Sequence, residues 1–399
     1  MVLLGRAPLV PRGEREVGRR GVGVLLSLVR HKGCWEAALA LAALVQSAEA
    51  EDITRLTSSV LWRSSQLEAG EPVVFGSPAR LVLTGEGVYF FDAQTQDVCF
   101  VSRAGVAETL TVTGEAPGHA FMVADIDVSP LQEIMAVVQG PMPSRTVLRS
   151  PLRPPFVLTQ TITPSESRAA MRVGVSARVR GDWVATHFTE RRISDFSHVV
   201  SRISLENLRT GETTTPIEKV VEYSYGQNSP EWWVWALDAS GAIFVSDDHN
   251  SAEILAISAS GNELFRTQLP VTATRKSDEI IELVKESFKP LAELGQKVPV
   301  VIEENYRLVE NIVCRNGKLF VLTSEGSRRG RGAARSIEWI VLSSRTGTLL
   351  ERITIELPFE DLSIRKAVFD GDTLIVLAQD VFTNDELELI GLEPIRTGP

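Results

Sequence analysis

Residues 232–270 contain four short apolar runs separated by polar turns, and this pattern limits the folds open to the chain. The runs are rich in Ile, Val, Phe and Trp, and the turns between them hold Asp, Asn, Ser and Gly. Short β-branched and aromatic runs bounded by turn residues are typical of β-strands. Four antiparallel strands in about 40 residues match the size of one β-propeller blade. The segment therefore predicts a four-stranded antiparallel sheet.

The same combination of a tight turn and an apolar run recurs along the chain, so we expect an all-β fold built from six such sheets. Five of the turns contain a glycine, at Gly87, Gly181, Gly241, Gly317 and Gly371, whereas the second unit lacks one. The predicted fold class is a six-bladed β-propeller of four-stranded antiparallel blades. The blades are expected at about residues 75–115, 117–162, 170–220, 230–270, 305–358 and 361–395.

Residues 271–304 depart from the strand pattern and predict a helical insertion between the fourth and fifth blades. Ser277 is a suitable N-cap, and the acids Asp278 and Glu279 suit the positive end of a helix. Apolar residues then recur at helical spacing as far as Pro290. Two interpretations stand: a helix packed over the end of the ring, and a lid over the central channel. We favour the first, because loops between blades often simply cover surface.

The first 50 residues have the composition of a secretory signal. They carry seven Lys and Arg residues, an apolar run at 37–45 and small residues at 47–50. A basic region, an apolar region and small residues before the cleavage point are the parts of a signal peptide. We predict cleavage after Ala50, export to the periplasm or the extracellular space, and one propeller domain over residues 51–399. The alternative is a buried N-terminal helix.

A further apolar segment at 53–62 precedes the first blade, while the last blade ends too early for a fourth strand of full length. An open ring of sheets would leave unpaired strand edges, which promote aggregation. We expect the N-terminal segment to supply the missing outer strand and close the ring.

A family resemblance rests on short motifs between and within the blades. Residues 113–121, followed by the strand at 126–128, resemble the G-x-G-P-G-x-F linker and following strand of bacterial six-bladed propellers of the NHL-repeat-like kind. The turn-strand steps at 241–245 and 317–321 resemble the repeated step of that family. The chain departs from the family in having His119 where an acid is frequent. The resemblance implies a fold and transfers no activity.

Charge and motif content narrow the function. A formal net charge of −10 disfavours a nucleic-acid partner, because phosphate binding needs a basic surface. The sequence lacks the nucleophile-elbow, zinc-protease, phosphate-loop and dinucleotide motifs. The histidines after residue 50 are scattered, so no metal site and no cofactor are predicted. Cys99 and Cys314 fall in blades that are not neighbours, so two separate thiols are expected rather than a disulfide.

Candidate binding residues lie in long polar loops, which the expected topology gathers on one face, opposite the glycine turns. Four arginines between 327 and 335 could bind an anionic group through fork-shaped donors, or form a solvated hairpin tip. The acids and histidine at 247–249 offer metal ligands, although a plain turn fits them better. Trp232 could stack on a sugar or aromatic ligand, or pack in the core. The candidates are Arg328, Arg329, Arg331, Arg335, Asp247, Asp248, His249, Trp232 and His119.

The predicted function is that of an exported binding scaffold, monomeric and without a cofactor. It would use its long-loop face to recognise a small molecule, a glycan or a protein. The alternative is a metal-dependent lyase or hydrolase with its site at the mouth of the channel, where His119 would be the histidine to test. A third interpretation is an assembly component that docks another protein. Three or more histidines or carboxylates lining the channel would favour the enzyme, and a large apolar patch would favour docking.

Overall fold

The computed structural model describes most of one unit, Ile53–Pro399. The described residues are 53–66, 78–110, 119, 121–129, 133–140, 146–152, 160–162, 170–192, 195–222, 233–293, 301–327, 336–359, 362–380 and 387–396.

Four of the sheets have four strands each, and within each sheet the strands follow chain order with antiparallel neighbours. This arrangement confirms the strands predicted for residues 232–270. The first sheet contains β2 (Pro78–Leu83), β3 (Gly87–Asp92), β4 (Val98–Ser102) and β5 (Ala107–Thr109). The second contains β6 (Val123–Ser129), β7 (Ile134–Gln139), β8 (Thr146–Pro151) and β9 (Gln160–Ile162). The third contains β10 (Ala170–Arg180), β11 (Trp183–Arg192), β12 (Asp195–Asn207) and β13 (Thr213–Glu222). The fourth contains β14 (Val234–Leu237), β15 (Ile243–Ser246), β16 (Glu253–Ile257) and β17 (Glu263–Gln268).

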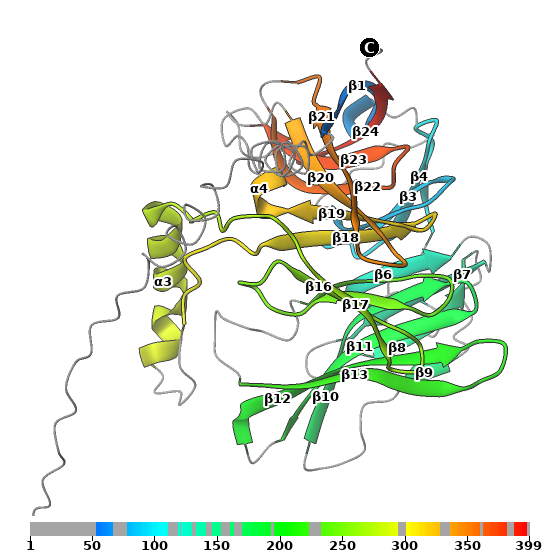
Figure 1. Ribbon diagram of the computed structural model, residues 1–399, viewed down its shortest axis with the longest axis vertical. Helices are drawn as coiled ribbons and strands as arrows, with labels where there is room; N and C mark the ends of the chain where they lie inside the picture. Colours follow the sequence, from blue (N-terminus) through cyan, green and yellow to red (C-terminus); the bar gives the residue numbers. More distant parts are fainter. Residues whose placement is uncertain are drawn as a thin grey trace, which may run out of the picture. The chain divides into compact units, whose positions relative to one another are not determined.

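The remaining strands form one eight-stranded sheet in the order β18-β19-β20-β21-β1-β24-β23-β22. Its strands are β1 (Ile53–Arg63), β18 (Val309–Arg315), β19 (Lys318–Thr323), β20 (Ser336–Ser343), β21 (Leu349–Glu356), β22 (Leu362–Phe369), β23 (Leu374–Asp380) and β24 (Leu387–Arg396). In Figure 1, β1 at the blue end of the chain lies against β24 at the red end.

Both edges of β1 are paired. One edge runs antiparallel to β24, with Leu56 opposite Arg396, and the other runs parallel to β21, with Leu56 opposite Ile355. The predicted N-terminal strand of the last blade is therefore confirmed. The predicted separation of the fifth and sixth blades is not observed, because the second edge of β1 joins β18–β21 and β22–β24 into a single sheet.

Buried apolar side chains form six clusters among the described residues: five lie between consecutive sheets, and the sixth packs the two halves of the eight-stranded sheet against each other. One of them packs Ile203 of the third sheet against Trp235 of the fourth. Another packs Leu389 of β24 against Phe90 of the first sheet, so that the last strands contact the first. The sheets thus follow one another around a closed circuit. This is a propeller arrangement.

The glycine turns also pack between sheets. Gly241 has a φ of 85°, a backbone conformation that side chains other than glycine rarely adopt. A Cβ at this position would lie 2.8 Å from the ring of Trp183, which belongs to the neighbouring sheet. The turn therefore needs glycine both for its backbone and for the close approach of the two sheets.

The insertion between the fourth and fifth blades contains α3 (Asp278–Glu293), as the sequence predicts. Ser277 caps the helix, since its Oγ accepts a hydrogen bond from the Ile280 N–H at 3.4 Å. Ile281 is buried, whereas Leu283 is 72 % exposed. The described residues also contain two short elements, η1 (Ser64–Gln66) and α4 (Ser324–Ser327). None of the helices within the described ranges is long and apolar enough to cross a membrane.

Candidate anion-binding site at the axis

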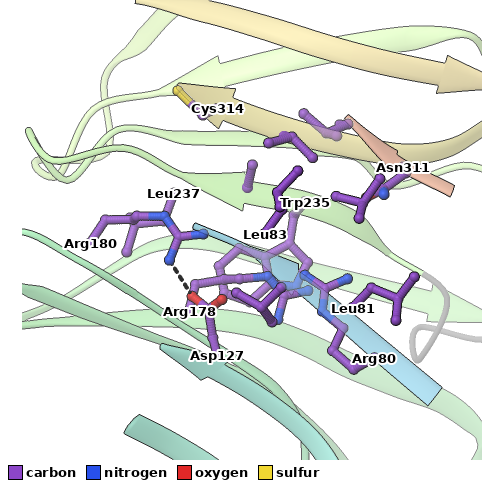
Figure 2. A pocket seen from close by; sticks show the side chains of 15 residues that line it. Arg80, Leu81, Leu83, Asp127, Arg178, Arg180, Trp235, Leu237, Asn311 and Cys314 are labelled. Atoms are coloured by element: carbon purple, nitrogen blue, oxygen red, sulfur yellow. Dashed lines mark hydrogen bonds and ion pairs between the residues drawn. The ribbon is translucent and has the colours of Figure 1, made fainter. Parts of the chain in front are cut away.

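A small cavity lies where the first strands of the sheets meet. Its walls come from β2, β6, β10, β14, β18 and β22, and Figure 2 shows the side chains that line it. The lining residues Leu83, Arg180 and Leu237 stand at the ends of their strands, just before the tight turns. The cavity therefore lies toward the face of the glycine turns and away from the face of the long loops. Its volume is about 30 Å³, which is room for about two water molecules.

Two acids on β6 face two arginines on β10. Because side chains in a strand alternate with a period of two, Asp125 and Asp127 project on one side of β6, and Arg178 and Arg180 project on one side of β10. Arg178 Nη1 donates to Asp125 Oδ2 at 2.8 Å, and Arg180 Nη1 donates to Asp127 Oδ2 at 2.8 Å. Figure 2 shows the Asp127 carboxylate pointing from its strand toward Arg180. One D-x-D segment on β6 and one R-x-R segment on β10 thus pair side by side, and we call these two ion pairs the axial ladder.

The same carboxylates also accept hydrogen bonds from backbone N–H groups at the inner edge of β10. A strand at the edge of a sheet leaves backbone N–H groups without a strand partner. Asp125 Oδ2 accepts the Ala177 N–H at 3.2 Å, and Asp127 Oδ2 accepts the Val179 N–H at 2.7 Å. The ladder therefore holds β6 against β10 by both charge and backbone hydrogen bonds.

Positive charge exceeds negative charge in this cluster. Arg80 Nε on β2 lies 3.6 Å from Asp125 Oδ1, so that Asp125 faces both Arg80 and Arg178. Burial, and then the neighbouring Arg178, lowers the pKa of Arg80 to about 10. Burial and the nearby Arg80 also lower the pKa of Lys366, whose Nζ donates to the carbonyl of Ala79. Four cationic groups thus lie close to two carboxylates.

Aromatic side chains pack against the guanidinium group of Arg178. The guanidinium carbon of Arg178 lies 4.7 Å from the ring centroid of Trp235, a cation–π distance. Trp235 Nε1 donates to Ser176 Oγ at 2.9 Å, which fixes the indole. His187 stacks on Trp233 with ring centroids 4.9 Å apart. This packing limits the positions that Arg178 can take.

Three polar atoms of the cluster are buried without a hydrogen-bond partner among the described residues. They are Asp127 Oδ1, Arg178 Nε and Arg80 Nε. Asp127 has no exposed surface and Arg178 is 6 % exposed. Since nearly all buried polar groups in proteins are hydrogen-bonded, one unused acceptor and two unused donors at a cavity wall indicate a place for a polar ligand group.

The chemistry available at the axis is recognition of an oxyanion. Guanidinium groups present paired N–H donors that match a carboxylate. Cys314 also lines the cavity, but burial raises the pKa of its thiol to about 12, so it is a poor nucleophile. Cys314 and Cys99 are both free thiols. Within the part of the chain that the structure describes, no three His, Cys, Asp or Glu side chains gather as metal ligands would.

The loop residues 247–249 form a turn away from this cavity. Asp247 Oδ2 accepts from Lys219 Nζ at 2.7 Å, and Asp248 Oδ1 accepts the Asn250 N–H at 2.9 Å. His249 is 8 % exposed, and its Nε2 hydrogen-bonds to the carbonyl of Asn305 at 3.0 Å. Burial lowers the pKa of this imidazole. The loop therefore anchors the end of the insertion to the fourth sheet.

The other sequence candidates are not brought together at the axis. His119 is half-buried and is not among the residues that line the cavity. Trp232, Arg328, Arg329, Arg331 and Arg335 lie outside the described residues. Sequence reasoning missed the axial ladder, although one signal was available: charged residues at alternate positions of the apolar strands that open the second and third blades.

Comparisons with known proteins do not assign the chain to a family. No protein family matches the sequence, and no curated protein matches it. A putative exported protein from Bacteroides fragilis is 10% identical, with a TM-score of 0.45 over 86% of this chain and 96% of its own. The PQQ-bound aldose sugar dehydrogenase of Streptomyces coelicolor is 12% identical, with a TM-score of 0.42 over 86% of this chain and 99% of its own. Regucalcin, a calcium-binding protein from Agrobacterium tumefaciens, is 10% identical, with a TM-score of 0.41 over 87% and 99%. At these values the likeness carries no inference about function.

Proposed function

We propose that the chain is a six-bladed propeller that binds a small ligand through an anionic group at its axis. The blade count treats the eight-stranded sheet as two blades joined by β1. Two observations support this count: six apolar clusters lie between strand sets, and six first strands line the axial cavity.

The observation that carries the binding proposal is the excess of guanidinium groups at the cavity. Within the described residues, three arginines, Arg80, Arg178 and Arg180, pair with two carboxylates, those of Asp125 and Asp127, in a chain whose formal net charge is −10. Concentrating cations in a buried place raises electrostatic energy unless an anion joins them. A bound oxyanion would lower that energy and would accept hydrogen bonds from the guanidinium donors.

The experiment is a titration of the purified protein with acetate, phosphate and chloride at constant ionic strength. Binding is followed by the melting temperature and by tryptophan fluorescence, because Trp235 stacks on Arg178. We expect saturable binding of an oxyanion and little effect of chloride. Replacement of Arg80→Gln should weaken binding about tenfold or more, the effect of losing a charged hydrogen bond.

Arg202→Gln is the matched control. The Arg202 side chain is 26% exposed and pairs with acids on its own sheet, whereas that of Arg80 is 27% exposed and faces the cavity. Equal binding by the two variants, or no saturable binding by the parent protein, would contradict the proposal.

We also propose that the protein is exported and that residues 1–50 are removed. The support is the basic, apolar and small-residue order of that segment. Intact-mass analysis of secreted protein should give a chain that begins at Glu51. The loop candidates Arg328, Arg329, Arg331, Arg335, Asp247, Asp248, His249, Trp232 and His119 stay predictions for a second recognition surface.

A further inference from the structure

We infer that the axial cavity selects a small carboxylic acid with a hydrogen-bond donor on the adjacent carbon, that is, an α-hydroxy or α-amino acid. This inference rests on the proposed function and names the ligand class of the same site. It follows from the three unused polar atoms, the size of the cavity and the position of the carboxylate of Asp127.

The unused donors call for an acceptor on the ligand. Arg178 Nη1 is occupied by Asp125 Oδ2, whereas Arg178 Nε is buried with no hydrogen-bond partner among the described residues. Arg80 Nε lies at 3.6 Å from Asp125 Oδ1, an ion-pair distance and too long for a hydrogen bond. A carboxylate is the small planar acceptor that suits such donors.

The unused acceptor calls for a donor on the same ligand. Asp127 Oδ2 already accepts the Val179 N–H and Arg180 Nη1, while Oδ1 accepts no hydrogen bond within the described ranges. Asp127 is fully buried and lines the cavity, so this oxygen is shielded from bulk solvent. A hydroxyl or ammonium group would donate to it, and a plain carboxylic acid would leave it unsatisfied.

The small volume of the cavity requires that the carboxylate and the donor group of the ligand lie close together. A volume of about 30 Å³ holds about two water-sized groups, so the polar end of the ligand enters and any larger part stays at the mouth. One carboxylate oxygen and a hydroxyl or ammonium group on the adjacent carbon are two such groups and fit within that limit, while the second carboxylate oxygen lies at the mouth. A phosphate or sulfate fits less well, because its oxygens face every direction and one would meet the carboxylate of Asp127.

The test compares ligands that differ by one group. Lactate and alanine carry a donor beside the carboxylate, propionate lacks the donor, and lactamide lacks the carboxylate. We expect lactate or alanine to bind about tenfold more tightly than propionate, which corresponds to one hydrogen bond to a charged group. Lactamide should not bind, and phosphate should bind more weakly than the better of lactate and alanine.

Asp127→Asn tests the acceptor directly. The substitution keeps one oxygen for the Val179 N–H and Arg180 and replaces the free oxygen by a donor. It should reduce the preference over propionate to less than about threefold while propionate itself still binds. Asp92→Asn is the control, because Asp92 is also buried but caps a turn in the first sheet. That variant should keep the full preference.

The outcomes separate this inference from the proposed function. If propionate, lactate and alanine bind equally and the binding depends on Arg80, the selection inference is wrong and the anion site stands. If none of them binds, both are wrong. The comparison of ligands on the parent protein decides the point even if Asp127→Asn fails to fold.

Discussion

His187 shows how the core behind the axial cavity responds to acid. The side chain has no exposed surface, and its Nε2 shares a hydrogen bond of 2.7 Å with Ser201 Oγ. Burial, and then the charge of Arg178, lowers the pKa of the imidazole to about 3. The folded protein therefore holds this side chain neutral at pH values where the unfolded chain takes up a proton.

This difference predicts a loss of stability in mild acid. Above a pH of about 6.5 the imidazole is neutral in both the folded and the unfolded state, so His187 causes no loss of unfolding free energy there. Between about 6.5 and about 3 only the unfolded state is protonated, and the free energy of unfolding should fall by about 1.4 kcal/mol per pH unit. Urea unfolding of His187→Phe should show a shallower acid slope than the parent by about that amount. Parallel curves would mean that His187 titrates alike in both states.

Gly241 predicts a second effect at the residue scale. Gly241→Ala should lower the free energy of unfolding by about 1–3 kcal/mol, because its φ of 85° is unfavourable for alanine and its Cβ would meet Trp183. Gly85→Ala is the control, since a Cβ there has no neighbour within 4 Å. The control should stay within about 0.5 kcal/mol of the parent in the same urea titration. A similar loss in both variants would contradict the packing argument.

At the scale of the element, β1 contributes core as well as hydrogen bonds. Leu56 is 6 % exposed and packs into the cluster that contains Trp339 and Phe369. Leu56→Ala should therefore cost about 2–4 kcal/mol of unfolding free energy. Val60 on the same strand is 40 % exposed, so Val60→Ala should cost less than about 1 kcal/mol. Denaturant midpoints of the two variants give the comparison, and equal midpoints would show that β1 does not pack as described.

Elements were predictable from sequence where the signal was local. Short apolar runs bounded by polar and glycine turns predicted β14 to β17, and the cap at Ser277 predicted the start of α3. The axial ladder was not predicted, because Asp125 and Arg178 are 53 positions apart and their pairing depends on how two sheets pack. The joining of the last two strand sets was also missed, since nothing local in residues 53–63 indicates a second partner strand.

At the scale of the whole molecule, closure depends on the first described strand. A chain that begins at Ser64 would lack β1 and expose the edges of β21 and β24. We expect it to self-associate, whereas a chain that begins at Glu51 should stay monomeric. Light scattering after size-exclusion chromatography measures both. A monomeric shorter chain with an unchanged melting temperature would mean that β1 is dispensable.

The pairing of β1 also sets how the ring responds to mechanical load. Leu56 near the start of β1 lies opposite Arg396 at the end of β24, so both strands leave the sheet at the same place. A force pulling the two ends apart acts across these antiparallel strands and breaks their backbone pairs one after another. Such peeling needs less force than sliding the strands past each other, where many hydrogen bonds resist together. Tethered by its ends, the ring should open first at the seam between β1 and β24, before any other sheet is disturbed.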